Sequence, residues 1–295
     1  MTLSDKLLIN KIIWIRSLDN NEIGPSLRMV EDLEQRAANG GFAFEELVVD
    51  DRKSLCIVLN DLAIQAESGI RPILHFDCHG SRDEGLYLKP SGEDFSWEEL
   101  VIALRKINIL TENNLCCVFG VCFGLRLSMS LELSKPTPYY LTIAPEKEVL
   151  VGTLEAKNTK FYDAVYQSGN ITDAFDKVWK PELKLFHCKE IFARALALHI
   201  ADHCSGKGSR KRREKMVTAV LNKNGISKPS PEQLADARKK VKKFLEPTQA
   251  LIDHYAPKFL IGREPGFGFT ELKRLSNGYV DRNRRRAEKA MKTKA

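Results

Sequence analysis

Two stretches decide the fold, residues 72–80 (PILHFDCHG) and residues 115–124 (LCCVFGVCFG). Each begins as a short, nearly continuous apolar run, which is typical of a strand buried on both faces in a parallel sheet. Each then ends in a reactive side chain, His79 in the first and Cys122 in the second, with a glycine close behind. Because ligands bind beyond the carboxyl ends of strands in open α/β sheets, both side chains are predicted to lie at one functional edge.

Working outward from these stretches, strands and helices alternate along the chain. Further strands are predicted at residues 11–18, 42–49 and 139–143, and a small hairpin arm at residues 85–88. Helices are predicted at residues 26–38, 51–69, 96–106 and 161–177. This alternation predicts an α/β fold, with a mostly parallel sheet covered by helices on both faces. Beyond residue 181 the periodicity predicts helices and no convincing strands.

Charge divides the chain into two regions. Residues 1–180 contain 19 Lys and Arg against 27 Asp and Glu, a net charge of −8, whereas residues 181–295 contain 27 against 12, a net charge of +15. Such asymmetry indicates two regions with different roles. We therefore predict a folded domain over residues 1–180 and a basic helical extension, a recognition or regulatory module, over residues 181–295. The extension is expected to face an acidic protein, the acidic domain itself or nucleic acid.

Composition excludes several classes of protein. The chain has 295 residues, 43% of them hydrophobic and 29% charged, which excludes collagen-like, low-complexity and wholly disordered chains. No apolar run approaches the roughly 20 residues of a membrane-spanning helix, and the first residues lack the pattern of a secretory signal. Seven cysteines without a spacing framework predict reduced thiols and a cytoplasmic location.

His79 and Cys122, 43 residues apart, are the residue types of a cysteine nucleophile and its base. A thiol becomes nucleophilic when an imidazole activates it and backbone N–H groups receive the oxyanion. Gly80 has no β-carbon, so its N–H can approach a substrate carbonyl closely. The two strand ends are therefore predicted to form a Cys-His dyad.

Four segments carry a resemblance to a known family: residues 73–80, 84–88, 115–124 and 161–175. In order and spacing they resemble the caspase-like cysteine peptidases, and the nearest branch is the bacterial CHAT (caspase-like) domain. The resemblance covers about residues 11–180 and leaves the basic remainder unexplained. It implies a caspase-like fold in which His79 is the general base and Cys122 the nucleophile. It also implies that the backbone N–H groups of Gly80 and Cys122 form the oxyanion hole, and that no cofactor or metal is needed.

The resemblance further implies an endopeptidase that cleaves one dedicated protein partner, alone or with a regulatory protein subunit, in a bacterial stress, cell-death or anti-phage pathway. In relatives that cut after Lys or Arg, an acidic residue stands two positions before the cysteine. Gly120 occupies that position here, supplying no charge and leaving space. Arg16 and Arg28 are candidates to line a pocket for an acidic or polar substrate side chain. Asp77 is a further pocket candidate, expected as a hydrogen-bonding neighbour of the site.

Two other classes of function stay open on the sequence. The first is a catalytically inactive caspase-like fold that binds an acidic partner or nucleic acid through its basic region. The second is a metal-dependent hydrolase, since His75, Asp77 and His79 alternate along one strand and share one face. Imidazole and carboxylate groups suit zinc or iron, although no complementary ligand cluster accompanies them.

Overall fold

The computed structural model describes residues 7–204 and 206–292. The chain divides into two compact units. The first, here called the sheet unit, comprises the described residues up to Lys189 together with Lys258–Arg263. The second, the helical unit, comprises Glu190–Pro257 and the described residues from Glu264 onward.

Eight strands in the described residues form one mixed sheet in the sheet unit, in the order β2-β1-β3-β6-β7-β8, with β4 and β5 attached as an arm at β3. Their bounds are β1 Lys11–Ser17, β2 Ala43–Val48, β3 Pro72–Ser81, β4 Gly85–Leu88, β5 Glu93–Phe95, β6 Cys116–Phe119, β7 Leu141–Ala144 and β8 Lys184–His187. Strands β2, β1, β3, β6 and β7 run parallel to one another. The prediction of a mostly parallel sheet is confirmed.

The central strands are the buried ones. Residues 12–17 of β1, 72–76 of β3 and all of β6 are buried, as their largely apolar sequences predict. Strand β8, at the edge of the sheet opposite β2, pairs antiparallel with β7. The expectation of no strands beyond residue 181 was therefore wrong. A strand of four residues, half-buried and containing two basic side chains, gives too weak a period-2 pattern to be found from sequence.

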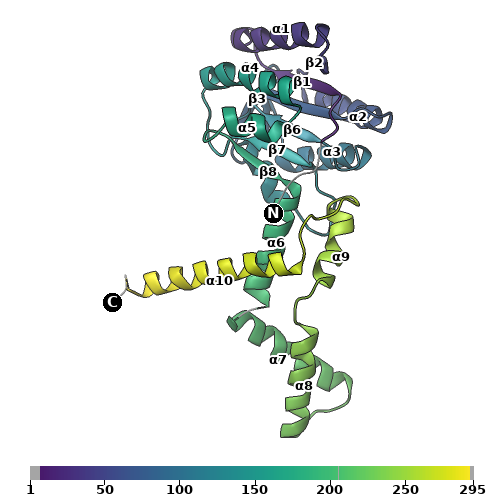
Figure 1. The fold of residues 1–295 in the computed structure, drawn as a ribbon, viewed down its shortest axis with the longest axis vertical. Helices are drawn as coiled ribbons and strands as arrows, with labels where there is room; N and C mark the ends of the chain where they lie inside the picture. Colours follow the sequence, from purple (N-terminus) through teal and green to yellow (C-terminus); the bar gives the residue numbers. More distant parts are fainter. Residues whose placement is uncertain (1–6, 205, 293–295) are drawn as a thin grey trace. The chain divides into compact units, whose positions relative to one another are not determined.

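Helices cover both faces of this sheet. Figure 1 shows α1 (Gly24–Ala38), α4 (Val151–Ser168) and α5 (Ile171–Val178) on one side, and α2 (Arg52–Glu67) and α3 (Trp97–Leu110) on the other. One predicted helix, residues 161–177, proved to be parts of two, α4 and α5. The break falls at Gly169, which adopts a left-handed backbone conformation, and Asn170, whose side chain caps α5.

The helical unit holds five helices among the described residues: α6 Cys188–His203, α7 Gly206–Lys223, α8 Pro231–Phe244, α9 Ala250–Phe259 and α10 Phe269–Lys292, two of which also contribute residues to the sheet unit. A helical architecture beyond residue 190 agrees with the periodicity. Within the described residues, no helix is both long and apolar enough to cross a membrane.

One short segment from late in the chain belongs to the sheet unit. The backbone carbonyl of Phe259 accepts from the Thr137 N–H at 2.9 Å, and the carbonyl of Leu260 accepts from the Asn113 side chain at 2.9 Å. The Arg263 guanidinium lies over the Tyr140 ring, 4.5 Å from its centroid. Residues 258–263 thus pack against the segments that precede β6 and β7. No local sequence pattern indicated this role.

Candidate active site

His79 lies on β3 beyond the core, where the strand leaves the sheet and pairs with β4, opposite Tyr87. Its imidazole is exposed, and its Nε2 lies 2.8 Å from Oε2 of Glu22 in the turn between β1 and α1. This hydrogen bond, the largest cause, lowers the pKa of the Glu22 carboxyl below its ordinary value. Glu22 is therefore held as a carboxylate beside the imidazole, which orients the ring and leaves Nδ1 to exchange a proton.

Cys122 lies in the turn between β6 and the 3₁₀ helix η1 (Gly124–Ser130). It is half-buried, and its Sγ lies 4.0 Å from the backbone carbonyl oxygen of Val149 in the loop after β7. The next residue, Phe123, has a left-handed backbone conformation, with φ of 61°. A bulky residue in this region is strained, and such strain gathers where a backbone must present a functional group.

Gly80 joins the two strand ends. A β-carbon at this position would lie 2.3 Å from the carbonyl oxygen of Cys122 and 2.4 Å from the Val121 side chain. Only glycine allows this approach, so the segment carrying His79 packs directly against the backbone of Cys122. The structure therefore brings the two sequence-predicted catalytic residues to one place. Among the described residues, no hydrogen bond joins the His79 imidazole to the Cys122 thiol. The imidazole bonds the Glu22 carboxylate instead, and the thiol lies near the Val149 carbonyl.

The backbone N–H of Cys122 donates no hydrogen bond to any described residue, whereas the N–H groups of Gly120, two residues before it, and of Phe123, directly after it, donate to carbonyls at 2.9 and 3.3 Å. An N–H without a protein partner beside a thiol is the donor that a developing oxyanion requires. Gly80, the second predicted donor, lies in the segment of β3 that pairs with β4.

A pocket of about 490 Å³ opens beside His79. It is lined by residues of the turn after β1, of β3 and of the β4–β5 arm: Glu22, His79, Gly80, Ser81, Glu84, Tyr87, Lys89 and Asp94. The pocket has the size of an ordinary ligand or peptide subsite. Because Glu22, Glu84 and Asp94 outnumber Lys89, its lining carries a net negative charge.

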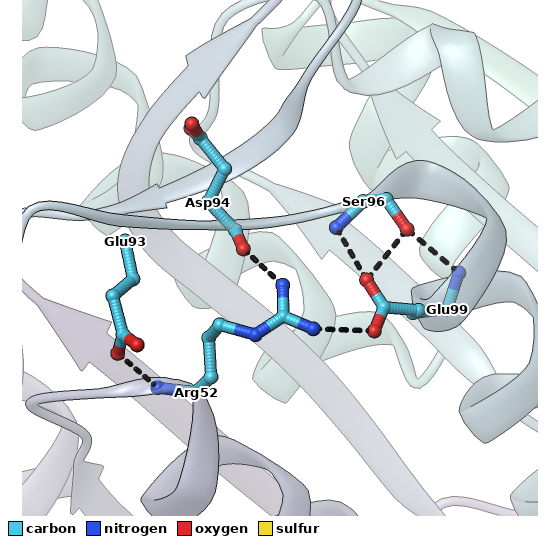
Figure 2. A network of polar contacts seen from close by, with 5 residues as sticks. All are labelled: Arg52, Glu93, Asp94, Ser96 and Glu99. Carbon is cyan, nitrogen blue, oxygen red and sulfur yellow. Dashed lines mark hydrogen bonds and ion pairs between the residues drawn. The ribbon is translucent and has the colours of Figure 1, made fainter.

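A polar network fixes the arm that forms one wall of this pocket. Figure 2 shows Arg52, at the start of α2, donating from its guanidinium to the Asp94 carbonyl and to the Glu99 carboxylate, the latter at 2.6 Å. Its backbone N–H donates to Glu93 at 3.0 Å. Glu99 also closes the capping box of α3 with Ser96. The network ties β5 to two helices and so holds the pocket wall in place.

Beneath the site lies a buried polar cluster. The His75 ring stacks on Trp14, with centroids 3.7 Å apart, and its Nδ1 lies 2.8 Å from the Tyr162 hydroxyl. Burial lowers the pKa of His75 to about 3, so the ring is neutral at physiological pH. Asp77 accepts hydrogen bonds from the Trp14 indole at 3.1 Å and from the Ser26 hydroxyl. Burial raises the pKa of Asp77 despite these bonds.

The three side chains of the alternating pattern do not point to one place. His75 bonds Tyr162, Asp77 bonds Trp14 and Ser26, and His79 bonds Glu22. No group of three or more His, Cys, Asp or Glu side chains in the described part of the chain is arranged to hold a metal ion. The metal-dependent alternative therefore gains no ligand cluster from the described side chains.

The candidate pocket residues lie elsewhere than the sequence suggested. Arg16 is 6% exposed, and its Nε lies 2.6 Å from the Glu46 carboxylate. Arg28 is exposed and pairs with Glu155 at 2.6 Å. Each guanidinium thus already has a carboxylate partner. Asp77 binds Trp14 and Ser26 and fastens β3 to α1, so it does not line the pocket beside His79.

Gly120 does not leave space, contrary to our expectation. A β-carbon there would lie 3.2 Å from Nε2 of His75 and 3.3 Å from the Phe76 carbonyl oxygen. The His75 ring fills the volume beside Gly120, so no substrate side chain can enter on that side. The glycine is instead explained by close packing of β6 against the His75 ring.

Glu22 and Tyr87 are the residues that sequence reasoning missed. Glu22 follows β1, and the carboxyl ends of parallel strands meet at one edge, so its proximity to His79 followed from the predicted topology. Tyr87 lies opposite His79 in the β3–β4 pair, with ring centroids 6.5 Å apart. Finding it required the register of the hairpin, which the sequence did not specify.

Compared with known proteins, the chain matches no protein-family model, and no curated protein sequence is significantly similar to it. Function is therefore inferred from the geometry of the site.

Proposed function

We propose that the sheet unit is a caspase-like cysteine endopeptidase in which Cys122 is the nucleophile, His79 the general base and Glu22 the residue that positions His79. The observation that carries this proposal is the packing of Gly80 against the Cys122 backbone, which places an imidazole and a thiol at adjacent strand ends. The His79 and Cys122 strands, β3 and β6, are neighbours in the sheet. The resemblance of residues 73–80 and 115–124 to caspase-like peptidases supports the same assignment.

In the proposed reaction, the Cys122 thiol gives its proton to His79, and Sγ attacks the scissile carbonyl carbon. The carbonyl oxygen becomes an oxyanion that accepts from the Cys122 N–H. The C–N bond then breaks, His79 returns the proton to the leaving amine, and a thioester remains on Cys122. Water, deprotonated by His79, hydrolyses the thioester and restores the thiol.

Glu22 acts through His79. Since His79 Nε2 bonds the Glu22 carboxylate, Nδ1 is the nitrogen available to the thiol. A carboxylate beside the ring stabilises the imidazolium formed when the thiol ionises. Hydrogen bonds between catalytic groups are often long in free enzymes and shorten when substrate binds, which accounts for the separate partners of the two groups. The proposed substrate is a dedicated protein partner in a bacterial stress, cell-death or anti-phage pathway.

Labelling by a thiol-directed peptide electrophile, read by intact-protein mass, tests the proposal. Wild type is expected to gain one label rapidly, and Cys122→Ala to gain none at that rate. The control is Cys56→Ala, because Cys56 is an exposed cysteine on α2 and its loss should leave the rapid label intact. Equal labelling of Cys122→Ala and wild type would instead favour the catalytically inactive binding module.

Glu22→Gln tests the positioning role. The variant keeps the size of the side chain but lacks the charge, so the labelling rate at neutral pH should fall about 10-fold or more. The pH profile of labelling should also shift, because the imidazolium formed when the thiol ionises loses its carboxylate partner. Glu84→Gln, a pocket residue without a bond to His79, should change neither. An unchanged pH profile in Glu22→Gln would remove Glu22 from the mechanism.

A further inference from the structure

The helical unit carries an apolar groove that the proposed peptidase does not use. It has a volume of about 550 Å³ and lies between α7 and α8, which pack against each other (Figure 1). Its floor is aliphatic and includes Met216, Leu221 and Val241, while Phe244 stands at its end with 74% of its surface exposed. A large exposed aromatic side chain beside an aliphatic groove marks an interaction surface.

The groove is elongated along the helices. Met216, Val220 and Asn224 recur at intervals of four residues on the α7 side, and Gln233, Ala237, Lys240 and Phe244 recur at intervals of three or four along α8. From Gln233 to Phe244 the stripe is roughly 16 Å long at 1.5 Å per residue. This length equals about three turns of a helix. A helix that presents apolar side chains at i, i+3, i+4 and i+7 has the shape to fill it.

The surface around the groove is strongly basic. Residues 206–245 contain 13 Lys and Arg against 3 Asp and Glu, a net charge of +10. Two of the three acidic residues are already paired, Glu214 with Arg238 at 2.9 Å and Asp236, on the groove wall, with Lys240 at 2.8 Å. Lys240 lines the groove itself, and Lys243, three residues further along α8, is exposed beside it. Charge complementarity therefore selects a partner with acidic flanks.

We propose that the α7–α8 groove docks an acidic amphipathic helix of a protein partner. The apolar face of that helix fills the groove between Val220 and Phe244, and its acidic flanks pair with lysines of α8. A nucleic acid fits less well, because the floor is aliphatic and, among the described residues, Phe244 is the only aromatic one lining the groove, whereas single-strand binding uses aromatic platforms. The proposal does not depend on the chemistry at Cys122.

The test uses the full-length protein and a fluorescein-labelled peptide of about 18 residues, with leucines at helical spacing and glutamates elsewhere. A scrambled peptide of the same composition and a labelled DNA duplex are the comparison probes. Fluorescence anisotropy is measured at low and high salt. The amphipathic peptide is expected to bind at least about 10-fold more tightly than the scrambled one, since only the former presents a continuous apolar face.

Variants separate the apolar from the charged contribution. Phe244→Glu and Val220→Glu should each weaken the amphipathic peptide about 10-fold or more, and Lys243→Glu should weaken it mainly at low salt. Ile64→Glu, at an apolar position on α2 whose exposure lies between those of Val220 and Phe244, should leave the affinity unchanged within about 2-fold. Phe244→Ala, with an unchanged melting curve, repeats the test if a glutamate disturbs folding.

Three outcomes would overturn the proposal. The first is equal affinity for the amphipathic and scrambled peptides, which would indicate non-specific attraction of polyanions. The second is tighter binding of the DNA duplex that Phe244→Glu leaves unchanged and Lys243→Glu weakens, which would assign the surface to nucleic acid. The third is no binding of any probe at low salt.

Discussion

The two units of this chain use side chains in opposite ways. The sheet unit buries polar groups with partners in its interior, as with Arg16 against Glu46 and His75 between Trp14 and Tyr162. The helical unit keeps most of its charges on the surface, and the α7–α8 hairpin has a small core of four buried residues, Val217, Leu221, Ala237 and Val241. Buried polar networks fix geometry, which a catalytic site requires. An open apolar groove with basic flanks is suited to binding.

The largest expected effect is on catalysis, which the comparison assigns to the sheet unit. Cys122→Ala and His79→Ala should each reduce turnover of a short peptide substrate by roughly 1,000-fold or more, and the double variant should be no worse than either single one, because the two act as a unit. Cys204→Ala in the helical unit should retain wild-type turnover. Substrate turnover by Cys122→Ala at the wild-type rate would show that Cys122 is not the nucleophile.

A second prediction compares an ion pair of each unit. Arg16→Ala should lower the free energy of unfolding by roughly 3–5 kcal/mol, because Glu46 would be left without its partner beside a buried strand. Arg238→Ala breaks the exposed pair with Glu214 in the helical unit and should cost less than about 1 kcal/mol. Urea unfolding measures both. Equal losses of free energy of unfolding in the two variants would mean that the burial of the Arg16 pair adds nothing to stability.

A third prediction concerns glycine. Gly80→Ala places a methyl group against the Cys122 carbonyl oxygen and should destabilise the sheet unit by roughly 1–3 kcal/mol, with loss of Cys122 labelling. Gly278→Ala in α10 meets no atom within 4 Å and has an ordinary helical backbone, so it should stabilise that helix by up to about 1 kcal/mol. Thermal melts with labelling rates distinguish them. Full labelling in Gly80→Ala would show that the strand ends need no close contact.

The smallest expected effect is a pH dependence. Because the folded-state pKa of His75 is about 3 and the ordinary value is 6.5, the unfolded chain takes up a proton that the folded chain does not. Stability should therefore fall as pH drops below about 6.5, by up to about 1.4 kcal/mol per pH unit from this group. His75→Phe should reduce this dependence between pH 7 and pH 5, whereas His254→Gln, an exposed position on α9, should not. An identical slope in His75→Phe and wild type would contradict the assignment.

The sequence by itself determined the class of fold and the two candidate catalytic positions. Nearly continuous apolar runs at residues 72–76 and 115–119 produce buried parallel strands, since apolar side chains on both faces must leave water. Once two such strands are parallel, the residues that follow them, His79 and Cys122, lie at one edge whatever the details of packing. The capping boxes of α2 and α3 are equally local, because the N-cap residue and the residue three positions later decide each of them.

Only the tertiary structure decided which groups surround those positions. Glu22 and Val149 contact His79 and Cys122 from loops far away in the chain, and the distance between such loops depends on the packing of every intervening element. The space near Gly120 was misjudged because the sequence does not show where the His75 ring points. Strand β8 and residues 258–263 likewise gain their stability from contacts with the rest of the sheet unit. Because their own hydrophobic periodicity is weak, no local sequence pattern predicted them.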